Sequence, residues 1–191
     1  MRRQVTSVYQ LKIVLQGIRP QIWRRVQVSA DIPLDELHLV LQAAMGWANS
    51  HLHSFTFGER RYTMPYEPGD LEELQREDEQ TMCLSELITE PKQIFGYDYD
   101  FGDNWEHGVM LEKRLPASPD TKYPLCLDGK RACPPEDCGG IWGYANLLKI
   151  LRNPAHEEYK EMRSWAGRKF DPEVFDVERF SKDFRRLRSY L

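Results

Sequence analysis

The feature that most constrains the fold is the strict alternation of apolar residues in "VYQLKIVLQ", whose buried face would hold Tyr9, Leu11, Ile13 and Leu15. Such alternation is typical of a β-strand with one face in a core. Gly17 and Pro20 follow as turn residues, and "IWRRVQVS" then alternates in the same way. The sequence therefore predicts a strand, a turn and a second strand.

Arg24 falls in the apolar row of the second strand, together with Ile22, Val26 and Val28. Period-two alternation places its guanidinium on the buried face. An unpaired buried charge is costly in free energy. We therefore expect Arg24 to pair with a carboxylate.

Further elements follow from helical and strand periodicity along the chain. A helix is expected from Leu34 to Met45 and ends at Gly46; a hairpin turns at Gly58-Glu59, and another covers 97–109. Residues 67–80 form an acidic surface insertion, as a solvated loop or short helix, and residues 143–191 form a C-terminal helical part. The prediction is a single α+β domain, 1–191, with a mixed, mainly antiparallel sheet and C-terminal helices packed on it.

Composition narrows the class of protein. Hydrophobic residues make up 41% of the chain and aromatic residues 12%, which fits a folded globule rather than a disordered chain. The net charge of −4 argues against general nucleic-acid binding, although a basic C-terminal helix leaves an accessory role open. No targeting segment or membrane span is recognisable, so we expect a cytoplasmic protein whose four cysteines are thiols or metal ligands.

The stretch "YDYDFGDNWEHGV" combines acids and aromatic residues in one predicted hairpin. With a loop at Gly102–Asn104, the rings share the buried face, while Asp98 and Asp100 share the other face with Glu106. Like charges across a ladder repel unless an arginine or a cation neutralises them. A shorter loop would instead set Asp100 against His107, as an ordinary ion pair.

Cys133 and Cys138 form a C-x4-C pair, which with His51 or His53 has the ligand types of a tetrahedral zinc site. We instead expect plain buried cysteines, with zinc absent or dispensable, because the chain lacks a second tight cysteine pair. Between the cysteines, Glu136 and Asp137 add carboxylates that could converge with Asp98 and Asp100. Such a group would suit a metal-assisted hydrolase.

Five ordered motifs carry a resemblance to a known family: "GIRPQIWRR", "LHLVLQAAMGWANSHLHSF", "YDYDFGDNWEHGV", "ACPPEDCGGIWGY" and "FDPEVFD". The chain closely resembles the Ri-plasmid ORF-three-like family, pRiA-type, from about Tyr9 to Asp176. The resemblance implies a compact α+β domain without an established biochemical role, similar to plasmid-borne or transposon-passenger proteins. The shared signature includes Asp98, Asp100, Asp103, Trp105, Cys133, Glu136 and Asp137. Some members are labelled resolvase-like, but no activated serine or tyrosine among arginines supports that label here.

Two hypotheses of function remain. The first is a noncatalytic binding module, associated with plasmid-type or mobile-element genes, whose acidic and aromatic surface holds a protein, a basic peptide or a small ligand. The second is a hydrolase, acting on phosphodiesters for example, with magnesium or manganese at Asp98, Asp100, Glu136 and Asp137. No cofactor is expected; a divalent metal would serve the second hypothesis, and zinc is left open only as a separate structural site at the cysteines. The candidate binding residues are Arg24, Asp98, Asp100, Asp103, Trp105, His107, Glu136, Asp137 and Trp142; the candidate metal ligands are His51, His53, Cys133 and Cys138.

Overall fold

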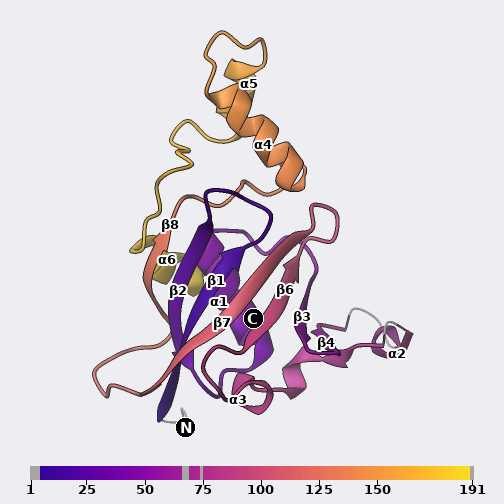
Figure 1. Ribbon diagram of the computed structural model, residues 1–191, viewed down its shortest axis with the longest axis vertical. Helices are drawn as coiled ribbons and strands as arrows, with labels where there is room; N and C mark the ends of the chain where they lie inside the picture. The colour runs from indigo at the N-terminus through magenta and orange to yellow at the C-terminus, as the bar shows by residue number, and fades with distance from the viewer. Residues whose placement is uncertain (1–4, 66–68, 74, 190–191) are drawn as a thin grey trace.

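The fold is a sheet with helices on one face and at one end, seen in a computed structural model that describes residues 5–65, 69–73 and 75–189 (Figure 1). The strands are β1 Ser7–Leu15, β2 Ile22–Ser29, β3 His53–Phe57, β4 Arg60–Thr63, β5 Glu77–Asp78, β6 Ile94–Tyr99, β7 Trp105–Pro116 and β8 Leu125–Lys130. The helices are α1 Leu34–Met45, α2 Asp70–Glu73, α3 Leu84–Leu87, α4 Gly140–Leu151, α5 Tyr159–Trp165 and α6 Arg179–Arg188, with a 3-10 turn at Glu79–Thr81. The predicted α+β class is confirmed.

The strand order in the sheet is β5-β4-β3-β6-β7-β1-β2-β8. Among the strands of the described residues, only β4 and β5 pair in parallel, and the other neighbours are antiparallel. The predicted N-terminal hairpin is β1 with β2, in which Ile13 lies opposite Arg24. The predicted turn at Gly58-Glu59 joins β3 to β4. Short hairpin connections join β1 to β2, β3 to β4 and β6 to β7, whereas the neighbours β3–β6, β7–β1 and β2–β8 are not consecutive in the chain.

Helix α1 supplies most of the layer that covers the sheet. Asp35 and Glu36 lie in its first turn, where they suit the positive end of the helix dipole, and Gly46 ends it with φ 84°. Every residue from Leu37 to Met45 is buried, because the helix lies between the sheet and α6. Helix α6 buries Phe180, Phe184 and Leu187 and exposes its basic residues.

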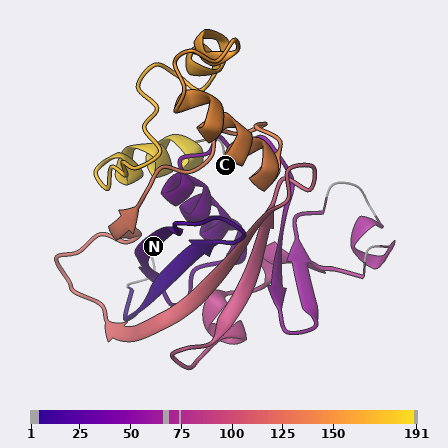
Figure 2. The same ribbon diagram turned by 45° about the horizontal axis from the view of Figure 1, so that its top comes forward.

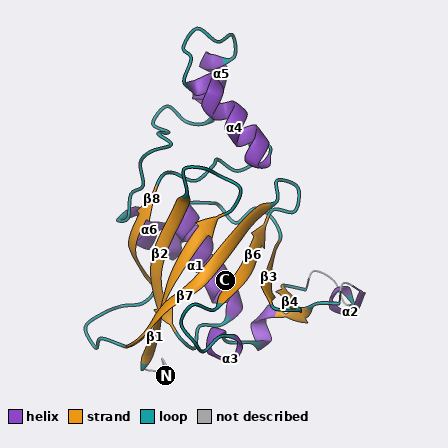
Figure 3. Cartoon of the chain, in the orientation of Figure 1, coloured by secondary structure: helices purple, strands orange, loops and turns teal. Residues whose placement is uncertain are grey.

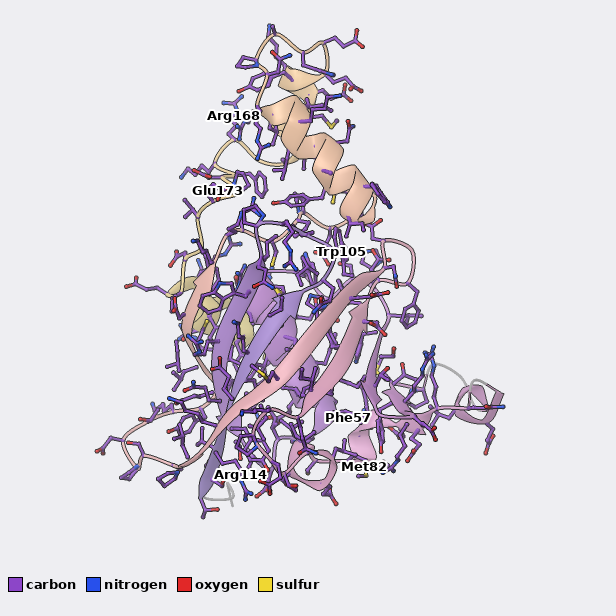
Figure 4. All side chains as sticks on the ribbon, viewed as in Figure 1. Phe57, Met82, Trp105, Arg114, Arg168 and Glu173 are labelled. Carbon is purple, nitrogen blue, oxygen red and sulfur yellow. The ribbon has the colours of Figure 1, made fainter. Side chains whose placement is uncertain are left out.

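Helices α4 and α5 stand beyond one end of the sheet, whereas α6 returns to the side of α1 (Figures 1 and 2). One end of the sheet lies toward α4, and the loops at that end lie beneath this helix (Figure 3). Trp105 marks the end of β7 nearest α4, and Arg114 lies toward the opposite end (Figure 4). In the part of the chain that is described, no helix is long and apolar enough to cross a membrane.

The β6–β7 hairpin has a longer loop than predicted. It spans Asp100–Asn104, so Tyr99 pairs with Trp105 and Asp98 with Glu106. The loop includes Asp100 and Phe101 in addition to the predicted residues, and a change of two residues leaves the alternation of the strands unaltered. The rings within the strands therefore keep the predicted face, but Phe101 lies outside the core and is exposed. Asp100 adopts φ 57° and no longer shares a face with Asp98. Of the two acids predicted to share a face with Glu106, Asp98 does so and Asp100 does not, and the alternative pairing of Asp100 with His107 is also wrong.

Candidate functional site

Three loops meet at the end of the sheet beneath α4, and direct hydrogen bonds join them. Trp47 Nε1 donates to the Pro134 carbonyl at 2.9 Å, which ties the loop after α1 to the segment that precedes α4. Gly139 N donates to Asp103 Oδ2 at 3.1 Å, which ties that segment to the β6–β7 loop. The loops therefore form one connected surface, on which side chains distant in sequence come together.

The carboxylate of Glu136 links these loops through two hydrogen bonds. Its Oε1 accepts a hydrogen bond from Tyr99 Oη at 2.6 Å, and its Oε2 accepts one from Ala48 N at 2.8 Å. Burial, followed by the hydrogen bond to Glu136, raises the pKa of Tyr99 well above its usual value, so the phenol stays a donor. Both carboxylate oxygens of Glu136 are thus engaged in holding the fold.

His51, Asp100 and Asp137 gather at the edge of this surface. His51 Nε2 lies 3.2 Å from Asp137 Oδ1 and 3.7 Å from Asp100 Oδ2. One potential ligand atom from each residue lies within 4.8 Å of the others. Asp100 is almost buried and also accepts hydrogen bonds from Gly102 N and Asp103 N, whereas Asp137 is largely exposed. This geometry suits a cation with oxygen and nitrogen ligands.

Asp98 does not join that group. It lies on the outer face of β6, opposite Glu106, because successive side chains of a strand point to opposite faces. Burial, and then the charge of Glu106, raises the pKa of Asp98, and Arg61 and Arg76 oppose this effect. The repulsion predicted from the sequence is present, but it lies away from the loop acids. Asp98 and Glu136 therefore do not form the predicted carboxylate group with Asp100 and Asp137.

Arg24 is buried on the inner face as predicted, but the expected carboxylate partner is wrong. Its Nε donates to the Ala44 carbonyl at 2.7 Å, its Nη1 to the carbonyls of Trp23 and Lys130, and its Nη2 to Cys133 Sγ. The Phe175 ring lies 3.8 Å from the guanidinium carbon. Ala44 is in the last turn of α1, whose negative dipole end favours a cation. Backbone carbonyls, that dipole and an aromatic face thus replace the acid.

The cysteines lie apart from the two predicted histidine ligands. Cys133 is buried, and its Sγ lies 3.1 Å from Met45 Sδ as well as against Arg24. Burial raises the pKa of Cys133, and it raises that of Cys138 to about 12. His51 faces Asp100 and Asp137 instead. Among the described residues, the only group with ligand atoms placed for a metal ion contains neither cysteine, so the candidate zinc ligands His51, His53, Cys133 and Cys138 are not brought together as one set.

Of the aromatic candidates, only Trp142 faces solvent. Trp105 is fully buried and His107 almost so, and His107 Nδ1 lies 3.1 Å from the Tyr97 carbonyl. Burial lowers the pKa of His107 to about 4, so its ring is neutral in the core. Trp142 is 82% exposed at the start of α4. The predicted burial of these rings is thus observed, and it removes Trp105 and His107 from the surface that a ligand could contact.

Trp142 borders a groove of about 300 Å³ between the β6–β7 loop and the start of α4. Asp103 and Glu106 bring the acids of this Trp142 groove, and glycines form much of its wall. Gly140 has φ 65°, and a Cβ there would lie 2.6 Å from the Asp103 carbonyl oxygen. Only glycine permits this close approach, which brings the acidic loop beside Trp142.

A second pocket, besides the Trp142 groove, lies around His38, His53 and Glu79, and the sequence did not predict it. The imidazoles of His38 and His53 stack with centroids 3.5 Å apart, and His53 Nε2 lies 2.8 Å from Glu79 Oε2. Glu79 belongs to the stretch predicted as an acidic surface insertion, of which residues 67, 68 and 74 lie outside the described residues, yet Glu79 is only 1% exposed. The spacing of His38 and Gln42 on one helix face was an available signal, whereas nothing near Glu79 in sequence indicates burial.

Comparisons with known proteins agree with this fold. A family model described as plasmid pRiA4b ORF-3-like protein matches residues 7–179. The uncharacterized protein y4hQ of Sinorhizobium fredii is 42% identical over 164 residues, which are 85% of this chain and 82% of that relative. The crystal structure of a protein of unknown function, MM3350 from Methanosarcina mazei, has a TM-score of 0.82 and 39% identity, covering 92% of this chain and 98% of the other. This chain therefore belongs to the plasmid pRiA4b ORF-3-like family, as its five motifs predicted.

Proposed function

We propose that this protein is a noncatalytic binding module of the kind encoded by plasmid-type genes, and that it holds a basic peptide segment in the Trp142 groove. The observation that carries the proposal is the 82% exposure of Trp142 beside two acids. Tryptophan is enriched at binding interfaces, and its ring offers both apolar area and a face for cations.

Charge supports a basic partner. Asp103 and Glu106 line the groove, and none of its described lining residues is a lysine or an arginine. Opposite charge speeds encounter and selects among partners, whereas a central aromatic residue contributes most of the affinity. A groove of about 300 Å³ suits one or two side chains of a peptide rather than a whole folded surface.

Selection from a library of short random peptides tests this proposal. Peptides retained by the wild type should be enriched in lysine and arginine, and Trp142→Ala should lose that enrichment. Trp165→Ala is the matched control, because Trp165 is also exposed but lies on α5. Retained peptides that are acidic, or that bind Trp142→Ala equally well, would count against the Trp142 groove as the binding site.

The second candidate is a divalent-metal-dependent hydrolase, which the grouping of His51, Asp100 and Asp137 within 4.8 Å favours. Carboxylate and imidazole ligands with an open position would allow a metal to activate water. Asp98 and Glu136, which the sequence suggested as ligands, are engaged elsewhere.

Manganese distinguishes the two candidates. We expect millimolar manganese to raise the melting temperature little, because Asp100 already accepts two backbone hydrogen bonds. A ligand that binds only the folded state at a hundredfold excess over Kd stabilises by about 2.7 kcal/mol, which is several degrees. A shift of that size, together with hydrolysis of bis(p-nitrophenyl) phosphate, would favour the hydrolase if Asp137→Asn removes both and Asp98→Asn neither.

A further inference from the structure

The hollow that contains His38, His53 and Glu79 has a volume of about 490 Å³ and is separate from the Trp142 groove. It lies between α1, the loop that follows it, the ends of β3 and β4, and the 3-10 turn. We propose that it binds a small molecule with a protonated amine, for which Glu79 is the counter-ion and Leu39, Leu52 and Met64 contact the apolar part. We call it the Glu79 pocket.

A chain of hydrogen bonds fixes His38 as a neutral ring. Gln42 Nε2 donates to Tyr97 Oη at 2.9 Å, so the tyrosine hydroxyl is free to donate to His38 Nδ1 at 2.8 Å. His38 Nε2 then carries the proton and donates to Asn49 Oδ1 at 2.6 Å. Burial lowers the pKa of His38 to about 3, in agreement with this assignment. Both nitrogens are engaged, so His38 forms a rigid, uncharged wall.

Glu79 supplies the negative charge. Its side chain is 1% exposed, and among the described residues its Oε2 contacts the imidazole of His53, whose own pKa burial lowers to about 3. Burial raises the pKa of Glu79 to about 7; Asp35 and Asp78 add to this effect, and His38 opposes it. A buried carboxylate without a cation is unfavourable, so a ligand with a positive charge would stabilise its ionised form.

The polar groups of the pocket favour an ammonium group over other ligands. Thr63 Oγ1 already donates to the His53 carbonyl at 2.7 Å, which leaves its oxygen as an acceptor. Asp35 adds a second carboxylate, and the described lining contains neither lysine nor arginine. An ammonium has three donors and no acceptor, which matches this set. A metal ion is disfavoured, because both His38 nitrogens are taken and His53 Nε2 contacts Glu79.

Binding should be coupled to the loss of a proton. Below the pKa of Glu79, the ammonium has to displace the proton that the carboxylate holds. With this pKa at about 7, the Kd should be about tenfold larger near pH 6 than near pH 8. The groups that face Glu79 are His53 of β3, His38 and Asp35 of α1, and Asp78 of β5; neither histidine, with pKa about 3, titrates in this window.

Cyclohexylammonium is the probe, with cyclohexanol and cyclohexanecarboxylate as neutral and anionic analogues of similar shape. Calorimetry near pH 8 should detect only the ammonium, and buffers of different ionisation enthalpy should reveal proton release near pH 6. Glu79→Gln should weaken binding near pH 8 at least about tenfold and remove the pH dependence. Glu59→Gln, at the exposed β3–β4 turn, should change neither.

Three results would overturn the proposal: no binding of the ammonium, equal binding of cyclohexanol, or unchanged binding in Glu79→Gln. If Glu79→Gln fails to fold, the proton release measured on the wild type still tests whether Glu79 is the counter-ion. Absence of proton release near pH 6 on ammonium binding would then exclude Glu79 as the counter-ion. None of these outcomes depends on peptide binding at the Trp142 groove.

Discussion

The Trp142 groove and the Glu79 pocket are both acidic, yet they are built in opposite ways. Loops form the groove, and its tryptophan faces solvent. The pocket instead lies among α1, β3 and a buried histidine stack, and its carboxylate is 1% exposed. Exposed charge beside an aromatic ring suits recognition of another chain, whereas a buried acid suits a small ligand with a matching charge.

The carboxylates at the two sites differ in their hydrogen-bond partners. Around the groove, Glu136, Asp103 and Asp100 accept backbone N–H groups and thereby hold loops together. In the pocket, Glu79 contacts a side chain, His53. Carboxylates concentrated in sequence are thus mostly structural here, and the acid best placed for a ligand comes from a stretch without a distinctive motif.

Arg24→Met should have the largest effect on stability. Unlike Glu79, a buried arginine cannot lose its charge, so the fold surrounds it with the carbonyls of Ala44, Trp23 and Lys130. Removing the donor leaves these carbonyls buried without partners, at a cost of about 4 kcal/mol. Urea denaturation measures this loss. Arg114→Met is the exposed control and should stay within about 0.5 kcal/mol of the wild type; equal losses would refute the role assigned to Arg24.

Glu79→Gln should change how stability depends on pH. The pKa of Glu79 is raised from 4.5 to about 7 in the fold, so its folded form retains a proton that the unfolded chain has lost. Titration of Glu79 therefore lowers the stability of the wild type as pH rises from about 4.5 to about 7, by a contribution of up to about 3 kcal/mol. The variant cannot titrate there and should gain stability relative to the wild type across that window.

Urea midpoints near pH 5 and pH 8 test this prediction. Burial is the largest cause of the lowered pKa of His38 and is present in both proteins, so most of the loss of stability that His38 causes as pH falls below about 6.5 is shared. A difference between the two proteins that does not change with pH would contradict the account of Glu79 as a buried acid.

Gly140→Ala should have a smaller effect, confined to the Trp142 groove. Both strain at φ 65° and contact with the Asp103 carbonyl oppose a methyl group there, so we expect a loss of about 2 kcal/mol. Gly58→Ala is the matched control, because Gly58 has φ 60° and nothing within 4 Å of an added Cβ. Its cost should be about 1 kcal/mol, from backbone strain alone. Equal costs would mean that the approach of Asp103 to α4 is not tight.

The elements that were predicted correctly are those indicated by patterns among residues close together in the sequence. Alternation located β1 and β2, helical spacing located α1 to its C-cap at Gly46, and Gly58-Glu59 located the β3–β4 turn. These features depend on neighbours in sequence, which is why they can be predicted.

What the sequence did not predict depends on contacts between distant residues. The length of the β6–β7 loop follows from a left-handed Asp100, and the partners of Arg24 come from α1 and from the region after β8. Burial of Glu79 requires β3 and α1 to close over it. Of the predicted site residues, the structure brings His51, Asp100 and Asp137 together and exposes Trp142, but it buries Trp105 and His107.

The affinity of a selected basic peptide for wild type, Trp142→Ala and Trp165→Ala tests the central claim most directly. Loss of a central tryptophan typically costs 2 kcal/mol or more, so Trp142→Ala should raise the Kd at least about tenfold, whereas Trp165→Ala should leave it unchanged. Stability should be similar in all three proteins, because both side chains are exposed. An unchanged Kd in Trp142→Ala would contradict the assignment of this surface as the binding site.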